Sequence, residues 1–180
     1  AAMEEDLVFG AACHVGAATG LRRGELCGLQ WARVDFEERS LLVEKTVNDA
    51  GGKLVIDDFT KTRRARWVGF DEYTAKLLTR LHDQHCDHVQ ALGLTPSPDA
   101  FAFTHSPDGS APLRPEYLTR RMRTLRRRLG IEGSDFDATL QAFRHWTQTT
   151  LSEAGYNAKQ VASRGGHSET LMNRVYVHRT

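Results

Sequence analysis

The sequence has no long apolar run, few cysteines and almost no net charge. No stretch approaches the roughly 20 consecutive apolar residues that a membrane-spanning helix needs, so we expect no membrane span. The N-terminus also lacks the basic, apolar and small-residue segments of a signal peptide. The 3 cysteines are widely spaced and form no CxxC pair. An odd number of scattered cysteines argues against a disulfide framework and for a reduced, cytoplasmic setting.

The length of 180 residues and the ordinary apolar fraction of 40% suit one compact domain with a hydrophobic core. The net charge of +1 conceals a segregation of charge along the chain. Basic residues gather in two segments, which hold Lys61, Arg63, Arg64 and Arg66, and Arg114, Arg120, Arg121, Arg123, Arg126, Arg127 and Arg128. Most are arginine, the better bidentate binder of phosphate. Nucleic acid is therefore a candidate partner, and a solvated helix face with a charged hairpin is the alternative.

The pattern of apolar residues and turn signals predicts a mainly helical α+β protein with a small antiparallel sheet of three strands. The expected strands are Leu41–Val43, Leu54–Ile56 and Trp67–Val68, with turns at 48–53 and 60–65. The expected helices span Leu7–Ala18, Arg22–Trp31, Asp71–Leu92, Pro115–Leu129, Asp137–Ala154 and Asn157–Gly165, followed by a last helix that Ser168 caps. Asn157 and Gln160 have the spacing of a capping pair. The three tryptophans, Trp31, Trp67 and Trp146, are expected in the core.

Cutting DNA without a metal ion requires a particular set of side chains. The scissile phosphate gains negative charge in the transition state, and arginine forks best stabilise that charge. A tyrosine nucleophile has an ordinary pKa of about 10, so it needs a base or a positive potential to attack. A further group must deliver a proton to the departing 5′ oxygen. Two arginines, a lysine, histidines and one tyrosine are the residues to look for.

Five segments of the chain provide these residue types. They are ATGLRRGEL at 18–26, TKT at 60–62, QAFRHW at 141–146, GGHS at 165–168 and YVH at 176–178. In this order and spacing they closely resemble the signature boxes of the tyrosine recombinases, the phage-integrase family. The resemblance implies the tyrosine-recombinase catalytic-domain fold. It also implies a site-specific DNA recombinase (integrase) that cleaves and rejoins double-stranded DNA through a 3′-phosphotyrosyl intermediate.

The resemblance assigns a role to each matching residue. Arg22 and Arg144 take the places of the two catalytic arginines that clamp the phosphate, and Glu25 that of the companion acid. The remaining roles are general acid, active-site histidine and nucleophile, which fall to Lys61, His167 and Tyr176. Because the bond energy is kept in the covalent intermediate, neither ATP, metal nor another cofactor is expected. Backbone-phosphate contacts are expected from Arg63, Arg64, Arg120, Arg121, Arg123, Arg126 and Arg127.

One position departs from the family pattern. The second box usually begins with histidine, and this chain has Gln141 there. Glutamine can donate a hydrogen bond but cannot accept and hold a proton as imidazole does, and general-base help is worth ~10²–10⁴-fold. A slower enzyme is expected if nothing compensates. His145 differs in helical direction by roughly 100° from Arg144, so it is expected to point elsewhere.

Several alternatives remain open. A catalytically weak or inactive DNA-binding module of the same fold is the main one, and Gln141 favours it. A type IB topoisomerase fits the spacing less well, and a metal-dependent nuclease fits poorly because no carboxylate cluster is present. His82, His85 and His88 with Cys86 are better explained as an exposed helix face than as a metal site.

The resemblance also sets expectations about the whole protein. Residues 1–180 are expected to be a single catalytic domain, a fragment without the N-terminal DNA-gripping domain and the C-terminal tail of the family. A homo-oligomer, a tetramer on DNA, is expected for the full-length protein, and a monomer is possible for the fragment.

Overall fold

A computed structural model describes residues 6–58, 65–131 and 139–166. The helices are α2 (Leu7–Thr19), α3 (Arg23–Cys27), α4 (Glu72–Ala91), α5 (Pro115–Arg128), α6 (Leu140–Glu153) and α7 (Ala158–Gly165), with a 3-10 turn, η1 (Trp31–Arg33). The strands are β1 (Val34–Asp35), β2 (Ser40–Val43), β3 (Thr46–Ala50), β4 (Lys53–Asp57) and β5 (Arg66–Gly69). The expectation of a mainly helical protein with a small antiparallel sheet is confirmed.

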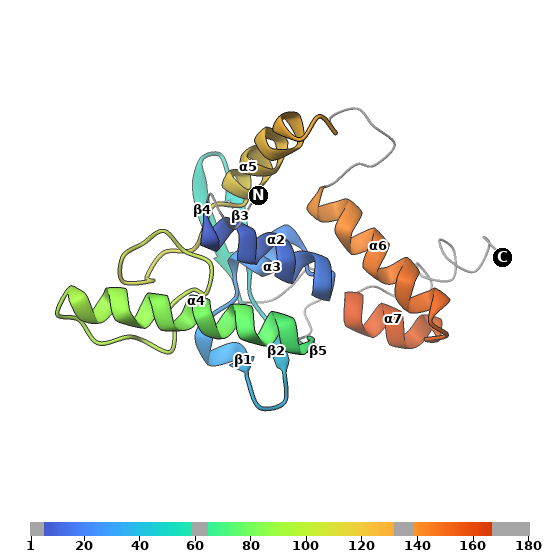
Figure 1. Ribbon diagram of the computed structural model, residues 1–180, viewed down its shortest axis with the longest axis horizontal. Helices are drawn as coiled ribbons and strands as arrows, with labels where there is room; N and C mark the ends of the chain where they lie inside the picture. Colours follow the sequence, from blue (N-terminus) through green and yellow to red (C-terminus); the bar gives the residue numbers. More distant parts are fainter. Residues whose placement is uncertain (1–5, 59–64, 132–138, 167–180) are drawn as a thin grey trace.

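Helix α2 is the centre of the packing. It begins where Asp6 accepts a hydrogen bond from the Phe9 amide at 3.0 Å, and it ends at Gly20, whose φ of 69° is left-handed. Buried Phe9 and Val15 belong to its apolar surface. The helix packs against both α4 and α6, and α6 in turn packs against α7 (Figure 1). The two helices that bring the last part of the described chain to the site are therefore anchored on α2.

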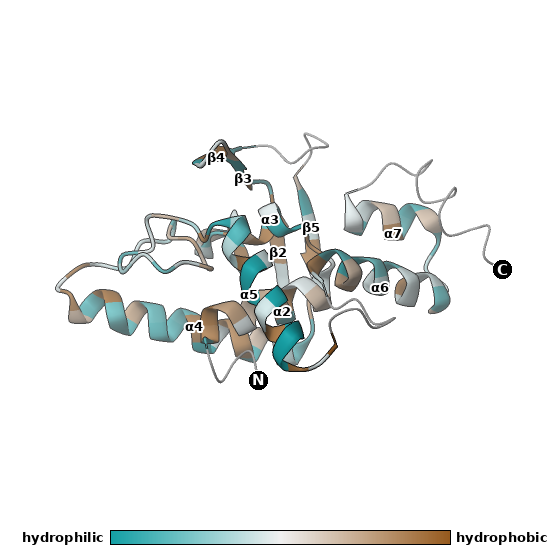
Figure 2. Cartoon of the chain, turned by 90° about the horizontal axis from the view of Figure 1, so that it is seen from above, coloured by the Kyte–Doolittle hydropathy of each residue, from teal (hydrophilic) through white to brown (hydrophobic). Residues whose placement is uncertain are grey.

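The small sheet contains three antiparallel strands in the order β1-β2-β5, with Leu41 opposite Val68. The expectation that Leu54–Ile56 is one of its strands is wrong. That segment lies in β4 and pairs only with β3, as a separate two-stranded hairpin around Gly51 and Gly52. The sheet edge on the other side of β2 is taken by β1. Most of β4 is exposed, Val55 and Ile56 included. Strand β3 packs against α3 and α5, and Figure 2 shows the hairpin at the edge of the molecule.

Most helix boundaries agree closely with expectation, whereas the burial of two tryptophans does not. Asp71 caps α4, and Asn157 and Gln160 form the expected capping box of α7. The expectation of one helix over Arg22–Trp31 is wrong, because α3 stops at Cys27 and the separate 3-10 turn η1 follows. Trp31 is buried as expected. The expectation for the other two is wrong, because Trp67 is 58% exposed and Trp146 is 61% exposed. Strand alternation explains the first, because buried Val68 follows it on β5.

Within the described ranges, no helix is both long and apolar enough to cross a bilayer.

Candidate active site

Arg22 lies at the start of α3 and is tied to the helix it begins. Its backbone amide donates to Glu25 Oε2 at 2.9 Å, and its Nη1 donates to Glu25 Oε1 at 2.8 Å. The Glu25 side chain is only 1% exposed, whereas that of Arg22 is 28% exposed. The expected pairing of the two residues at i, i+3 is therefore present. A buried carboxylate holds the more exposed arginine in one orientation.

Arg66, on β5, is a second arginine on the same carboxylate. Its Nη1 and Nη2 donate to the two oxygens of Glu25 at 3.0 and 2.8 Å, and its Nε donates to the carbonyl of Arg164 at 2.9 Å. The Arg66 side chain is 9% exposed. Burial alone would raise the pKa of Glu25, but the hydrogen bonds and charge of Arg66, with a smaller contribution from Arg22, hold it below its ordinary value. Glu25 therefore stays ionised between two cations.

Arg144, on α6, is buried. Its Nη1 donates to the carbonyl of Gly20 at 2.5 Å, and its Nη2 donates to the carbonyl of Gly165. These carbonyls lie at the C-terminal ends of α2 and α7, where the helix dipoles favour a cation. His145, the next residue, is exposed, so the expectation that it points elsewhere is confirmed.

The two arginines of the sequence boxes meet at one short segment of backbone. Arg22 Nη2 donates to the carbonyl of Gly166 at 2.9 Å, and Arg144 donates to the carbonyl of the preceding residue, Gly165. Residues 122 positions apart in the sequence are thus brought to adjacent carbonyls immediately before His167. The end of α7 is the point of convergence.

Both arginines also line one cleft, of about 700 Å³. Its wall comes from the start of α3, one side of α5 and the first turn of α6. The lining residues are Arg22, Arg23, Leu118, Thr119, Met122, Arg123, Arg126, Thr139, Leu140, Gln141 and Arg144. Five of these are arginines, and the N-terminus of α6 adds the positive end of its dipole. The cleft is suited to an anion with several oxygens, such as a phosphodiester.

Gln141 is exposed in the first turn of α6 and lines this cleft beside Arg144. The structure therefore places the residue that departs from the family pattern where a side chain can reach a bound anion. Its amide can donate to a phosphate oxygen but has no titratable proton.

The arginines of α5 do not all face the same way. Arg123 and Arg126 line the cleft, and Arg120 and Arg127 are exposed. Arg121 is half-buried, with its guanidinium carbon 5.6 Å from the centre of the Phe9 ring. Arg121 therefore lies on the side of α5 that faces α2. Of the α5 arginines predicted to contact DNA, it is the one least favourably placed to do so.

Five of the predicted site residues lie outside the described residues. They are Lys61, Arg63, Arg64, His167 and Tyr176. The described chain reaches the residue directly before His167 and the residues on both sides of 59–64. Their roles stay predictions.

Sequence reasoning missed Arg66 as part of the site. It appeared only as one of several basic residues near the second turn. One argument could have pointed to it. If Glu25 is buried and Arg22 stays exposed to a ligand, the carboxylate needs a second cation as a partner. The partner lies 41 residues away from Glu25, and no local pattern connects them.

Three described side chains that could in principle act as nucleophiles are poorly suited to it. Burial and a hydrogen bond at 2.5 Å to Asp6 raise the pKa of Tyr117 to about 12. Burial also raises the pKa of Cys13 and Cys27 to about 12. All three groups are therefore held in their protonated, poorly nucleophilic forms near neutral pH.

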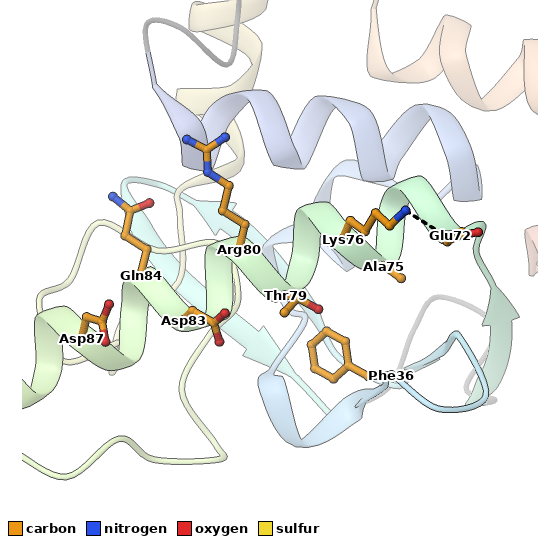
Figure 3. Close-up of a pocket in the computed structure, with 9 residues that line it drawn as sticks. All are labelled: Phe36, Glu72, Ala75, Lys76, Thr79, Arg80, Asp83, Gln84 and Asp87. Atoms are coloured by element: carbon orange, nitrogen blue, oxygen red, sulfur yellow. Dashed lines mark ion pairs between the residues drawn. The ribbon is translucent and has the colours of Figure 1, made fainter.

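A second groove runs along α4 and has different chemistry. Its lining mixes both signs of charge, with Glu72 and Lys76 in an exposed ion pair at 2.6 Å (Figure 3). Among the described residues, no group of three or more His, Cys, Asp or Glu is arranged to hold a metal ion. The exposed-face interpretation holds for His88, whereas His82 and His85 are half-buried, the former packed edge-on against Trp31. This groove has no converging set of like charges.

Comparison with known proteins shows the family to which the chain belongs. Residues 4–180 match the phage integrase family, and the chain belongs to that family. It is 27% identical over 173 residues to a tyrosine recombinase XerC-like protein of Caldanaerobacter subterraneus subsp. tengcongensis, covering 89% of this chain and 43% of that protein. It is 26% identical over 177 residues to the ICEBs1 integrase of Bacillus subtilis (strain 168), covering 97% of this chain and 46% of that protein. The chain thus spans less than half the length of these curated relatives.

Solved structures have the same fold. The Tn1549 transposon integrase in complex with circular intermediate DNA superposes with a TM-score of 0.76 at 24% identity, covering 99% of this chain and 62% of that one. XerA recombinase superposes with a TM-score of 0.70 at 23% identity, covering 99% of this chain and 56% of that one. The predicted tyrosine-recombinase catalytic-domain fold is confirmed.

Proposed function

We propose that residues 1–180 act as the catalytic domain of a site-specific DNA recombinase that cuts and rejoins double-stranded DNA. The observation that carries the proposal is the convergence of Arg22 and Arg144 on the carbonyls of Gly165 and Gly166, at the edge of an arginine-lined cleft. Two buried or partly buried guanidinium groups held in fixed orientation are what a developing phosphorane charge requires. The DNA complexes of the Tn1549 integrase support the same partner.

In the proposed reaction the scissile phosphate binds in this cleft. Arg22 and Arg144 hold its non-bridging oxygens, Gln141 donates one further hydrogen bond, and His167 is assigned another. The Tyr176 oxygen forms a bond to phosphorus as the bond from phosphorus to the 5′ oxygen breaks. Lys61 donates a proton to that oxygen, and the tyrosine proton passes to solvent. A 5′ hydroxyl from a partner strand then reverses the step and releases the tyrosine.

Chemistry of this kind needs no metal ion and no ATP, because the phosphotyrosyl bond conserves the energy of the broken phosphodiester. Partner-strand exchange requires more than one active site. We therefore propose that the full-length protein acts as a homo-oligomer on DNA, a tetramer in the family pattern. The exposed arginines of α5 and the predicted Arg63 and Arg64 are assigned to the flanking phosphates.

A second candidate is a DNA-binding module of the same fold with little activity. The specific observation in its favour is Gln141, which lines the cleft without a group that can take a proton. Under this alternative the arginine cleft would still bind a phosphate. It would bind without cleavage.

Relaxation of supercoiled plasmid in EDTA separates the two. The wild-type chain is compared with Tyr176→Phe, and with Tyr156→Phe as a matched control at a tyrosine that is exposed and outside the cleft. We expect relaxation by the wild type and the control, and none by Tyr176→Phe. Relaxation that survives Tyr176→Phe would refute the proposed nucleophile. DNA binding without relaxation, even after Gln141→His, would favour the binding module.

A further inference from the structure

We propose that Arg66 is a positioning residue of this site, which keeps the Arg22 guanidinium aimed at the bound phosphate by holding Glu25 from the opposite side. The inference rests on the proposed function, since it assigns Arg66 to that same site. Arg66 itself does not line the cleft, so its action passes through Glu25.

The first argument is the number of bonds that meet on one carboxylate. Glu25 accepts four hydrogen bonds: two from Arg22, through its backbone amide and Nη1, and two from Arg66, through Nη1 and Nη2. A bidentate pair fixes the plane of the carboxylate as well as its position. Rotation of Glu25 about its last torsion would break the bonds of Arg66. The plane that Arg22 meets is thereby fixed.

The second argument is that Arg66 also fixes the other anchor of Arg22. Its Nε donates to the carbonyl of Arg164, two residues before Gly166, whose carbonyl accepts from Arg22 Nη2. A Cβ at Gly166 would lie 2.9 Å from Arg66 Nη1, so the backbone of α7 and the guanidinium are in close contact. Arg66 therefore contacts Glu25 and the backbone beside the Gly166 carbonyl, the two places that hold the Arg22 side chain.

The third argument concerns charge. The charged groups that act on Glu25 in the described chain are Arg66 and Arg22, from β5 and from the start of α3. The contacts from α7 are backbone carbonyls, and the Arg164 guanidinium turns away to the carbonyl of Gly69 at 2.7 Å. Without Arg66, the pKa of Glu25 would rise, because the two largest contributions that lower it come from Arg66. A protonated Glu25 keeps only one acceptor oxygen without a proton, and its attraction for Arg22 is lost.

The test is the pH profile of plasmid relaxation at saturating DNA. Arg66→Ala is compared with the wild type, Arg66→Lys and Arg33→Ala. The last variant removes an arginine–glutamate pair whose residues do not line the cleft. We expect the Arg66→Ala rate to fall by about 10²-fold, comparable to the loss of a transition-state donor, with little change in the DNA concentration at half-maximal rate. We also expect an acid limb, in which the rate falls with acid at a higher pH than in the wild type, because the pKa of Glu25 rises when Arg66 is removed. Arg66→Lys should recover part of the rate and flatten the limb, because it restores the charge.

A merely structural role gives a different result. It would lower the rate at every pH in proportion to the folded fraction measured by circular dichroism, and Arg33→Ala would act in the same way. Either that result or an unchanged Arg66→Ala would overturn the inference. If Arg66→Ala does not fold, Arg66→Gln takes its place, because it keeps more of the side chain but not the charge, and the same acid limb is expected.

The Nε–H signal of Arg22 in ¹⁵N NMR, assigned through Arg22→Lys, tests the inference without activity. We expect one resolved signal in the wild type and its loss or averaging in Arg66→Ala. A persistent signal would overturn the inference whether or not the protein cuts DNA. An inactive wild type with the expected NMR change would instead count against the proposed function alone.

Discussion

Replacing Glu25 with glutamine should destabilise the fold far more than loss of an ordinary ion pair. The change keeps the shape of the side chain but removes the charge that two arginines share. Arg66 would then be left 9% exposed with no counter-charge, and at least one guanidinium N–H would face the amide NH₂. Breaking a buried pair from one side costs about 3–5 kcal/mol, a large part of the roughly 5–15 kcal/mol that stabilises a typical domain.

Urea denaturation followed by circular dichroism measures this cost. Glu44→Gln is the matched control, because Glu44 pairs with Arg33 and both side chains are more exposed, at 24% and 36%. We expect the control to lose no more than about 1 kcal/mol. If Glu25→Gln lost no more than the control, the central position of the carboxylate would be refuted.

The same experiment has a defined pH dependence. The folded pKa of Glu25 lies below its ordinary value of 4.5, so its ionisation adds stability that is fully present above that value. That contribution is lost as the pH falls through the folded pKa. The gap between the wild type and Glu25→Gln should therefore be constant near neutrality and shrink below about pH 4.5. A gap that widened with acid would contradict the reasoning.

Three further predictions follow from the same geometry. Gly24→Ala should cost about 1–3 kcal/mol in thermal unfolding, because its Cβ would lie 2.5 Å from Thr46 Oγ1 and 2.6 Å from the Val47 carbonyl; an unchanged Tm would contradict this close approach of α3 to β3. Arg123→Ala should lower the slope of log K against log salt for DNA binding by about 0.9, measured by fluorescence anisotropy, and an unchanged slope would remove this residue from the phosphate contacts. Gln141→His should raise the rate of plasmid relaxation by about 10²-fold or more, and an equal rate would mean that glutamine suffices here.

Local signals in the sequence predicted most of the helices. Capping residues and glycine stops set both ends of α2, α4 and α7, because these signals act within one turn of the chain. Membership of the sheet was not predictable in the same way. The strand-like run at Leu54–Ile56 has the right composition, but only the three-dimensional packing decides that β1 and β5 occupy both sides of β2.

In the candidate site, too, residues in local motifs were predicted and residues that act through long-range contacts were not. Arg22, Glu25 and Arg144 were predicted because the boxes that contain them resemble those of a known family. Arg66 was not, because its role depends on a contact with a residue 41 positions away. The meeting of Arg22 and Arg144 at the end of α7 likewise depends on the packing of α6 and α7, which no single segment encodes.

Mass spectrometry of the protein–DNA adduct tests the central claim most directly. The wild-type chain is incubated with supercoiled plasmid in EDTA, quenched with SDS, and digested with nuclease and protease, so that any covalent nucleotide stays on its peptide. The account predicts a 3′-phosphonucleotide on Tyr176, which disappears in Arg22→Ala and Arg144→Ala proteins that remain folded. An adduct on Tyr117 or any other residue, or an undiminished adduct without the two arginines, would contradict it.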